Sequence, residues 1–368
     1  MDTQIGRAGE DRAALSRDAA SLSLVEFWNE RRDIELQAPR NRVQPYKWSW
    51  SDIEPRLLEA ARIVPLEEAE RRALVFANPG LGGKPYITQT LFAAYSLYNP
   101  GETAPVHRHT PSASRFVLQG GGGYTTVGGE KITMARGDLV LTPNGQWHDH
   151  GNEGDEPVIW VDVLNVPLVE SLDATIFEFA YVEGNAPEAG APMERRDRQT
   201  VRAPAEHSHN LYAAGGLKPL FVDHARGTTE HSPQYFYRWA DTRQALDRLR
   251  GYEGCPWDGI ILEYIDPTTG GPVMPSMSFR SQLLRAREAT RPQRRMASTI
   301  YCVLEGHGVT EIGGRRFEWG PNDVFVVPNW AWHHHEAGAE DAVLYSVTDE
   351  PAMRKLGLYR QEGAAPTA

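Results

Sequence analysis

Three histidines stand at a spacing that suits one metal ion. His107 and His109 are two positions apart, and alternate side chains of a β-strand share one face, so both imidazoles can point into the same space. His148 lies on a later run and can approach from a strand across the same barrel. Neutral imidazole is a common ligand of divalent transition metals. The spacing predicts a mononuclear site with coordination positions left open.

Two motifs surround these histidines. Their positions are Gly101, His107, His109 and Gly120 in the first, and Gly137, Pro143, Gly145, His148 and Asn152 in the second. The spacing resembles the paired motifs of the cupin superfamily. The glutamate of the first cupin motif is missing, because Ala113 or Ser114 stands in its place. The alternative interpretation is a cupin that keeps its histidines for packing.

The missing glutamate has a chemical consequence. Three neutral ligands leave Fe(II) with its full charge, which favours an anionic substrate that binds through two oxygens and leaves room for O2. A 2-hydroxybenzoate carries such a pair in its carboxylate and ortho hydroxyl groups.

The C-terminal part of the chain repeats the scaffold without the site. Aligning residues 117–120 with 303–306 places Gln293 and Arg295 where His107 and His109 stand. His333 matches His148, but one histidine without its two partners is not a transition-metal site. We therefore expect one metal ion per chain and structural roles for residues 333–335.

Bulk composition limits the classes of partner. The 368 residues suffice for two domains at the usual size of about 100 to 200 residues each. A formal net charge of -11 argues against nucleic acid and anionic membranes, since both require concentrated Lys and Arg. No apolar run approaches the roughly 20 residues that span a bilayer, and no signal pattern opens the chain. A cytoplasmic protein is expected.

The residue composition and hydrophobic pattern change along the chain and predict four parts. Residues 1–85 are expected to be helical with loops, including a short helix over 66–74. Short β-rich runs punctuated by glycine fill 86–182 and return in 258–368. A polar linker with one amphipathic helix covers 183–257, and its His207 and His209 are expected in a surface loop. The predicted fold class is all-β, a bicupin of two double-stranded β-helix (jelly-roll) barrels with an N-terminal helical segment.

Further segments resemble the gentisate 1,2-dioxygenase family, which includes enzymes that cleave salicylate, 1-hydroxy-2-naphthoate and 5-nitrosalicylate. The similar segments are Glu70–Gly80, Thr90–Phe92, His107–Thr110, Arg115–Val117, Trp147–Asn152 and Asp266–Gly271. The resemblance implies a homotetrameric Fe(II) enzyme. Such an enzyme inserts both atoms of O2 between the carboxyl-bearing and hydroxyl-bearing carbons of a small aromatic carboxylic acid.

The resemblance also implies roles for individual residues. It makes iron ligands of His107, His109 and His148. Arg71 and Arg115 would hold the substrate carboxylate, because guanidinium forks suit planar carboxylates. His150 would contact the substrate hydroxyl and assist its deprotonation, and Asp162 would be an acid of the pocket. The alternatives are a solvated surface role for Arg71 and structural roles for His150 and Asp162.

Two positions bear on the substrate. Phe92 stands where related enzymes tend to present tyrosine or tryptophan, and Ser96 stands where many gentisate enzymes present glutamine. Loss of a polar partner for a 5-hydroxyl would weaken discrimination for gentisate. Gentisate, cleaved to maleylpyruvate, is the first expectation; salicylate, 5-nitro- or 5-halosalicylate and 1-hydroxy-2-naphthoate are the alternatives.

Two other classes of function fit the same motifs. A non-catalytic bicupin, with a storage or regulatory role, would bind an aromatic acid without consuming oxygen. A cupin isomerase or hydrolase would use Zn or Mn, and metal analysis with an oxygen electrode would separate it from an iron dioxygenase.

Overall fold

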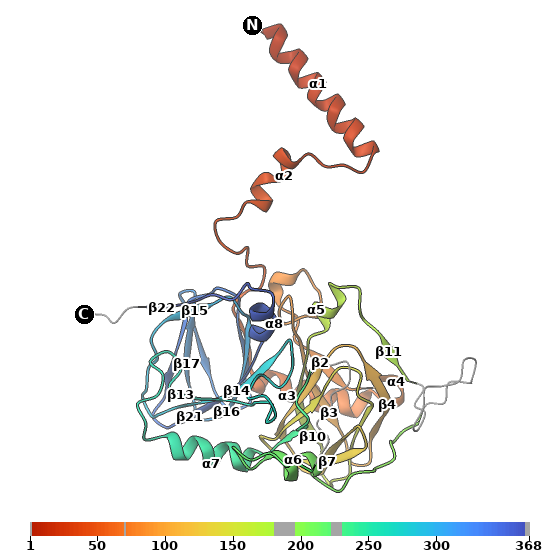
Figure 1. The fold of residues 1–368 in the computed structure, drawn as a ribbon, viewed down its shortest axis with the longest axis vertical. Helices are drawn as coiled ribbons and strands as arrows, with labels where there is room; N and C mark the ends of the chain where they lie inside the picture. The colour runs from red at the N-terminus through yellow and green to blue at the C-terminus, as the bar shows by residue number, and fades with distance from the viewer. Residues whose placement is uncertain (1, 70, 180–195, 222–229, 365–368) are drawn as a thin grey trace. The chain divides into compact units, whose positions relative to one another are not determined.

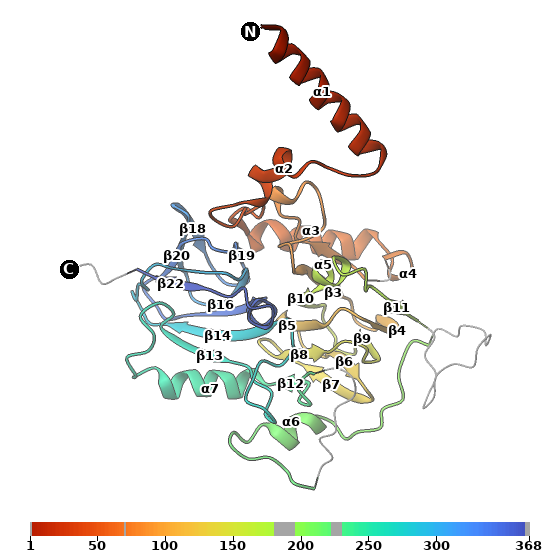
Figure 2. The ribbon, with the colours of Figure 1, turned by 45° about the horizontal axis from the view of Figure 1, so that its top comes forward.

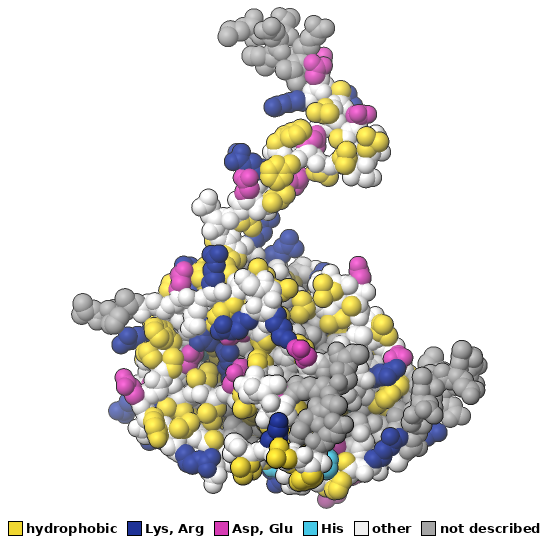
Figure 3. Space-filling view, in the orientation of Figure 1, with side chains coloured by type: hydrophobic (Ala, Val, Ile, Leu, Met, Phe, Trp, Pro, Cys, Tyr) yellow, Lys and Arg dark blue, Asp and Glu magenta, His cyan; other side chains and the backbone are white. Residues whose placement is uncertain are grey.

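The computed structural model of the protein describes residues 2–69, 71–179, 196–221 and 230–364 (Figure 1). The chain forms two compact units, Met1–Asn41 and Arg42–Ala368. The first unit consists of α1 (Asp2–Ser21) and α2 (Phe27–Ile34). Figure 3 shows apolar side chains in yellow along this unit, and its exposed large ones include Leu22, Leu24, Val25, Phe27 and Trp28.

The first barrel of the larger unit is built from two antiparallel sheets. Its six-stranded sheet has the order β12 (Phe236–Tyr237), β8 (Leu139–Thr142), β5 (Ala113–Gln119), β10 (Val158–Leu164), β3 (Phe92–Tyr98), β2 (Ala73–Val75). The five-stranded sheet has the order β11 (Phe177–Glu178), β4 (Thr103–His109), β9 (His148–Asn152), β6 (Gly123–Val127), β7 (Glu130–Met134). Gly128 and Gly129 both have positive φ, which lets a two-residue turn join β6 to β7.

The second barrel repeats this plan. Its six-stranded sheet has the order β1 (Tyr46–Trp48), β19 (Val324–Val327), β16 (Thr299–Glu305), β21 (Ala342–Thr348), β14 (Ser278–Leu284), β13 (Ile260–Glu263). The five-stranded sheet has the order β18 (Arg315–Trp319), β17 (Gly308–Ile312), β20 (His333–Ala337), β15 (Gln293–Arg295), β22 (Gln361–Gly363).

The two six-stranded sheets contribute to one hydrophobic core, and the barrels lie side by side in Figures 1 and 2. Phe116 of the first barrel stacks on Tyr345 of the second, with ring centroids 3.7 Å apart. The Tyr95 hydroxyl crosses between the barrels and donates to the carbonyl oxygen of Asn322 at 2.6 Å. The opposite face of each six-stranded sheet therefore lines the interior of its own barrel. The expectation of two β-barrels with N-terminal helices is confirmed.

Helices cover the outside of this β structure. Those of the larger unit are α3 (Trp50–Ile63), α4 (Leu66–Ala69), the 3-10 turn η1 (Pro79–Leu81), α5 (Val166–Glu170), α6 (His207–Tyr212), α7 (Trp239–Leu249) and α8 (Glu350–Lys355). The amphipathic α7 buries Leu246 in a cluster with Ile260, Leu283 and Val343 of the second barrel. α7 therefore corresponds to the amphipathic helix expected in the linker.

Several local expectations were wrong. The segment 1–85 is not only helical, because β1 pairs with β19 of the second barrel and β2 pairs with β3 of the first. The helix expected over 66–74 ends at Ala69. His207 and His209 begin a short helix, α6, instead of lying in a loop. Residues 183–195 and 222–229 of the expected linker lie outside the described residues, and the four domain boundaries stay a prediction.

On the face drawn in Figure 3, Lys and Arg side chains are interspersed with Asp and Glu side chains. Among the described residues, no helix is long and apolar enough to cross a membrane.

Candidate metal centre

Strands β4 and β9 bring three histidines together inside the first barrel. The strands are antiparallel, and His107 lies opposite His148 in their register. The ring centroids of His107 and His109 lie 4.2 Å and 4.7 Å from that of His148, and all three side chains are buried. Two positions on one strand and one on its neighbour thus bring three imidazole rings close together.

Backbone carbonyls fix the tautomer of each ring. The Nδ1 atoms of His107, His109 and His148 lie 2.7, 2.6 and 2.8 Å from the carbonyl oxygens of Pro105, Pro111 and Gln146. Because a carbonyl only accepts, each Nδ1 carries the proton and each Nε2 carries a lone pair. The Nε2 atoms of His109 and His148 are buried without a hydrogen-bond partner. Unused lone pairs on buried imidazoles fit a metal cofactor.

The electrostatics of the site keep these rings neutral. Burial is the largest cause that lowers the pKa of His109, to about 4. Burial followed by the charge of Arg71 holds the pKa of His107 well below its usual range, and burial followed by His107 does the same for the pKa of His148. Neutral imidazole is the form that coordinates a metal.

A fourth histidine lies beside the three. Ligand atoms of His107, His148 and His150 lie within 4.8 Å of one another, and this is the sole such group of three His, Cys, Asp or Glu among the described residues. The group contains His150 and not His109. His150 differs from the others in its partners. Its Nδ1 lies 3.0 Å from the Thr125 hydroxyl, and its Nε2 lies 2.7 Å from Nη2 of Arg115, which must donate. Both nitrogens of His150 are therefore engaged.

Arg115 is buried at the centre of a polar network. Its Nη1 donates to the Thr142 hydroxyl at 3.1 Å, and its Nε lies 3.2 Å from Oδ1 of Asp162. Strand pairing enforces the second contact, because Arg115 on β5 lies opposite Asp162 on β10. Burial is the largest cause that lowers the pKa of Arg115, and Asp162 opposes it. The carboxylate thus helps to keep this guanidinium charged inside the barrel.

Asp162 also bonds to side chains of its own strand β10 and of the neighbouring strand β3 in the same sheet. The Ser96 hydroxyl donates to its Oδ2 at 2.5 Å, and the indole Nε1 of Trp160 donates to the same oxygen at 2.9 Å. Ser96 and Phe92 are four positions apart on β3, hence on one face of the sheet, and Phe92 pairs with Leu164 at the end of the strand. Ser96 is therefore linked to Arg115 through Asp162. Phe92 lies on the same face of the sheet as Ser96, at the end of the strand.

Arg71 reaches the histidines from outside the two main sheets. It is half-buried just before β2, and its Nη1 lies 3.3 Å from Nε2 of His107. A donor at this position faces the lone pair that a metal would use. Arg71 is therefore part of the cluster, and the solvated surface alternative does not describe its contacts.

Two phenylalanines that lie beside the histidines were not predicted from the sequence. Strand β11 pairs with the edge of β4, with Phe177 opposite His109. The Phe177 and His109 ring centroids are 5.0 Å apart, and those of Phe179 and His107 are 6.2 Å apart. Alternation in Phe177-Glu178-Phe179 was the available signal, but the strand is too short to stand out.

The equivalent place in the second barrel holds other groups. Gln293 lies opposite His333 in the register of β15 and β20, as His107 lies opposite His148 in the first barrel. The guanidinium of Arg295 pairs with the Asp258 carboxylate at 2.5 Å. In the described part of this barrel, no three ligand atoms meet as they do in the first.

Comparisons with known proteins agree with this architecture. The sequence model of the cupin domain matches residues 94–164 and 286–348. A 5-aminosalicylate 1,2-dioxygenase of Comamonas sp is 39% identical over 362 residues, which is 97% of this chain and 91% of the relative. Gentisate 1,2 dioxygenase 1 of Aquipseudomonas alcaligenes is 38% identical over 342 residues, 93% of each chain.

A solved structure extends the similarity to the whole fold. The crystal structure of salicylate 1,2-dioxygenase from Pseudoaminobacter salicylatoxidans, as an adduct with gentisate, is 32% identical and superposes with a TM-score of 0.87. The match covers 96% of this chain and 94% of that one. This chain therefore belongs to the family of gentisate- and salicylate-type 1,2-dioxygenases, ring-cleaving oxidoreductases built on two cupin domains.

Proposed function

We propose that this protein is an Fe(II)-dependent dioxygenase that opens 2-hydroxybenzoates between the carboxyl-bearing and hydroxyl-bearing ring carbons. The proposed ligands are His107, His109 and His148. The observation that carries the proposal is their common tautomer, in which three Nδ1 atoms bond to backbone carbonyls and three Nε2 atoms carry lone pairs. The Nε2 lone pairs of His109 and His148 have no partner, and that of His107 faces Nη1 of Arg71. Three imidazoles with open positions suit a metal that must also take substrate and oxygen.

His150 is proposed to act beside the metal instead of on it. Its Nε2 accepts from Arg115 and its Nδ1 is bonded to Thr125, so its lone pair is already in use. The lone pair of His109 has no such partner. When Arg115 turns to a bound carboxylate, Nε2 of His150 becomes free to accept the proton of the substrate hydroxyl.

The arginines supply the charge that recognises the acid. Arg71 stands next to His107, and Arg115 stands next to His150, so two guanidinium groups flank the four rings. Arg115 has five N–H donors, and its Nη1 and Nη2 atoms donate to Thr142 and His150, whereas its Nε lies 3.2 Å from Asp162 without a hydrogen bond. The remaining donors can hold the substrate carboxylate. Asp162 is proposed to orient Arg115 and to balance its charge.

Iron, when bound, would supply electrophilic activation of the chelated substrate and a binding position for O2. The residues around it position the two reactants and exclude water. Maleylpyruvate has the atoms of gentisate plus two oxygens. Its formation from gentisate and O2 therefore retains both oxygen atoms in the product and needs no other reductant.

Gentisate is the proposed substrate, with salicylates that lack the 5-hydroxyl as the second candidate. The relatives named for gentisate support the first. The second is supported by the relative named for 5-aminosalicylate and by the short Ser96 side chain, whose hydroxyl hydrogen is already donated to Asp162. A pocket without a long polar group at this position imposes little on the 5-substituent.

The test is oxygen uptake by protein reconstituted with Fe(II), Mn(II) or Zn(II), using gentisate, salicylate, 5-aminosalicylate, 5-nitrosalicylate, 5-chlorosalicylate and 1-hydroxy-2-naphthoate. Uptake with Fe(II), and incorporation of both atoms of isotopically labelled O2, is expected. Ligand binding without uptake would instead identify the non-catalytic bicupin, and turnover with Zn(II) alone would identify a hydrolase or isomerase.

A homotetramer and a cytoplasmic location stay predictions from the resemblance and the sequence.

A further inference from the structure

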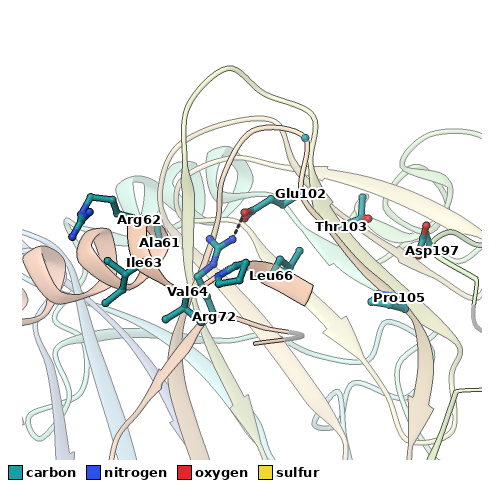
Figure 4. Close-up of a pocket in the computed structure, with 12 residues that line it drawn as sticks. Ala61, Arg62, Ile63, Val64, Leu66, Arg72, Glu102, Thr103, Pro105 and Asp197 are labelled. Carbon is teal, nitrogen blue, oxygen red and sulfur yellow. Dashed lines mark hydrogen bonds and ion pairs between the residues drawn. The ribbon is translucent and has the colours of Figure 1, made fainter. Parts of the chain in front are cut away.

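An ion pair with a buried arginine lies on the outer side of the first barrel, one residue from Arg71. Arg72 and Glu102 point toward each other at a cavity of about 700 Å³ between the end of α3 and the start of β4 (Figure 4). We infer that the Arg72–Glu102 pair is a positioning device that sets Arg71 for the substrate carboxylate. This inference rests on the proposed function, in which Arg71 binds that carboxylate.

Arg72 is buried, Glu102 is partly buried, and two of the three guanidinium nitrogens of Arg72 have no hydrogen-bond partner. The Arg72 side chain is 4% exposed and that of Glu102 is 20% exposed. Nη2 of Arg72 donates to Oε1 of Glu102, whereas Nε and Nη1 of Arg72 have no hydrogen-bond partner. A buried guanidinium with one hydrogen-bonding group depends on that group for its position. Loss of Glu102 should therefore release the Arg72 side chain.

Backbone hydrogen bonds link this pair to the strands of the site. The amide of Leu97 on β3 donates to the carbonyl oxygen of Arg72 at 3.0 Å. Oε2 of Glu102 accepts from the amide of Asn99 at 2.7 Å, and the amide of Asn152 on β9 donates to the carbonyl of Glu102 at 2.9 Å. The pair thus fastens the chain that enters β2 to the turn that begins β4.

Neighbouring residues of an extended chain point to opposite sides, and the contacts of these two arginines follow that rule. Arg71 reaches inward to Nε2 of His107, and Arg72 reaches outward to Glu102. The element that precedes Arg71 is the four-residue helix α4, which is too short to hold the chain firmly. The side chain of Arg72 is therefore a buried anchor for the backbone that carries Arg71.

The experiment is a double-mutant cycle in the full-length, Fe(II)-loaded protein, with KM and kcat measured on the best substrate of the panel. Arg72→Met should raise KM on the order of tenfold, because a displaced Arg71 loses most of its contact with the carboxylate. Iron content and kcat should change far less. Arg71→Met should raise KM at least as much, and the double variant should be no worse than Arg71→Met alone.

The matched control is Arg62→Met. Arg62 lines the same cavity but lies on α3, is 69% exposed and pairs with Glu59, so its loss should leave KM unchanged. Glu102→Gln should reproduce part of the Arg72→Met effect, and Arg72→Lys should recover part of the wild-type KM. If Arg72→Met does not fold, Glu102→Gln combined with Arg71→Met completes the cycle.

The outcomes separate the inference from the proposed function. Additive effects of Arg71→Met and Arg72→Met, or an unchanged KM in Arg72→Met, would overturn the positioning role while leaving the enzyme assignment intact. An unchanged KM in Arg71→Met would overturn the carboxylate role of Arg71 itself. Absence of oxygen uptake by the wild-type protein would overturn the proposed function.

Discussion

The two barrels share a scaffold and differ in the groups that fill it. In the first, His107 and His109 present lone pairs to the interior of the barrel. In the second, Gln293 and Arg295 occupy the aligned positions, and both bond to Asp258, at 2.9 Å and 2.5 Å. Burial raises the pKa of Asp258, but Arg295 and the amide of Gln293 lower it more. At the positions aligned with His107 and His109, the second barrel thus holds an amide and a guanidinium that are both bonded to a carboxylate.

The supporting hydrogen bonds are present in both barrels. The His150 ring bonds to the Thr125 hydroxyl at 3.0 Å, and the His335 ring bonds to the Thr310 hydroxyl at 2.8 Å. His148 and His333 both place Nδ1 near the carbonyl oxygen two residues earlier. The comparison shows that the arrangement of the strands and the orientation of the imidazole rings are not enough to form the three-histidine cluster. The two residues contributed by one strand, β4 or β15, decide it.

The most severe test of this comparison removes the matched histidine from each barrel. His148→Ala should lose most of the bound iron and nearly all oxygen uptake, because three ligands act as a unit. His333→Ala should retain both. Elemental analysis and an oxygen electrode measure the two effects. Two tightly bound irons per wild-type chain, or equal metal loss in the two variants, would break the comparison.

The next test removes the matched side chain on the central strand, Arg115 in β5 or Tyr301 in β16. Arg115→Ala should leave iron bound and raise KM for the aromatic acid roughly 10- to 100-fold, since a hydrogen bond to a charged group contributes about 1.5 to 3 kcal/mol. Tyr301→Phe should leave KM unchanged. Equal KM values for Arg115→Ala and wild type would return Arg115 to a structural role.

The sequence predicted the site where spacing along one strand was enough. His107 and His109 share a face because strands have a period of two, and the second motif positioned His148. The Arg115–Asp162 contact could not be predicted from spacing, because it depends on the pairing of β5 with β10. Arg71 needed the family resemblance, since its contact with His107 joins residues from different elements.

The fold was predicted at the level of barrels and missed at their edges. Glycine-punctuated β runs identified both barrels. Strands β1, β2 and β11 have only two or three residues each, too few to show a period. Their pairing partners come from distant segments, so tertiary contacts decide their conformation. Phe177 was missed for this reason.

A pH test uses the histidines of the second barrel, which have no proposed metal. Burial is the largest cause that lowers the pKa of His333 from 6.5 to about 4. The unfolded state therefore binds the proton more tightly, so this histidine's contribution to stability is present above about pH 6.5 and is lost as pH falls toward 4. His333→Gln should lose less stability over that window, by on the order of 2 to 3 kcal/mol. Urea unfolding at pH 7 and pH 4.5 measures the difference, and identical pH slopes for both proteins would contradict it.

The smallest expected effect concerns the inward faces of β3 and β14. Ser96 on β3 aligns with Gln282 on β14, so the two barrels carry the short and the long polar side chain at matched positions. Ser96 donates to Asp162, which faces Arg115, whereas the amide of Gln282 donates to the carbonyl of Asp258.

Ser96→Gln should lower kcat/KM for 5-chloro- and 5-nitrosalicylate relative to gentisate by a few-fold, since a longer amide narrows the pocket and offers a partner to a 5-hydroxyl. Gln282→Ser should change none of these ratios, because it alters only the barrel without the proposed site. If Ser96→Gln also leaves every ratio unchanged, Ser96 acts only as a partner of Asp162, and the 5-substituent is recognised elsewhere on the wall.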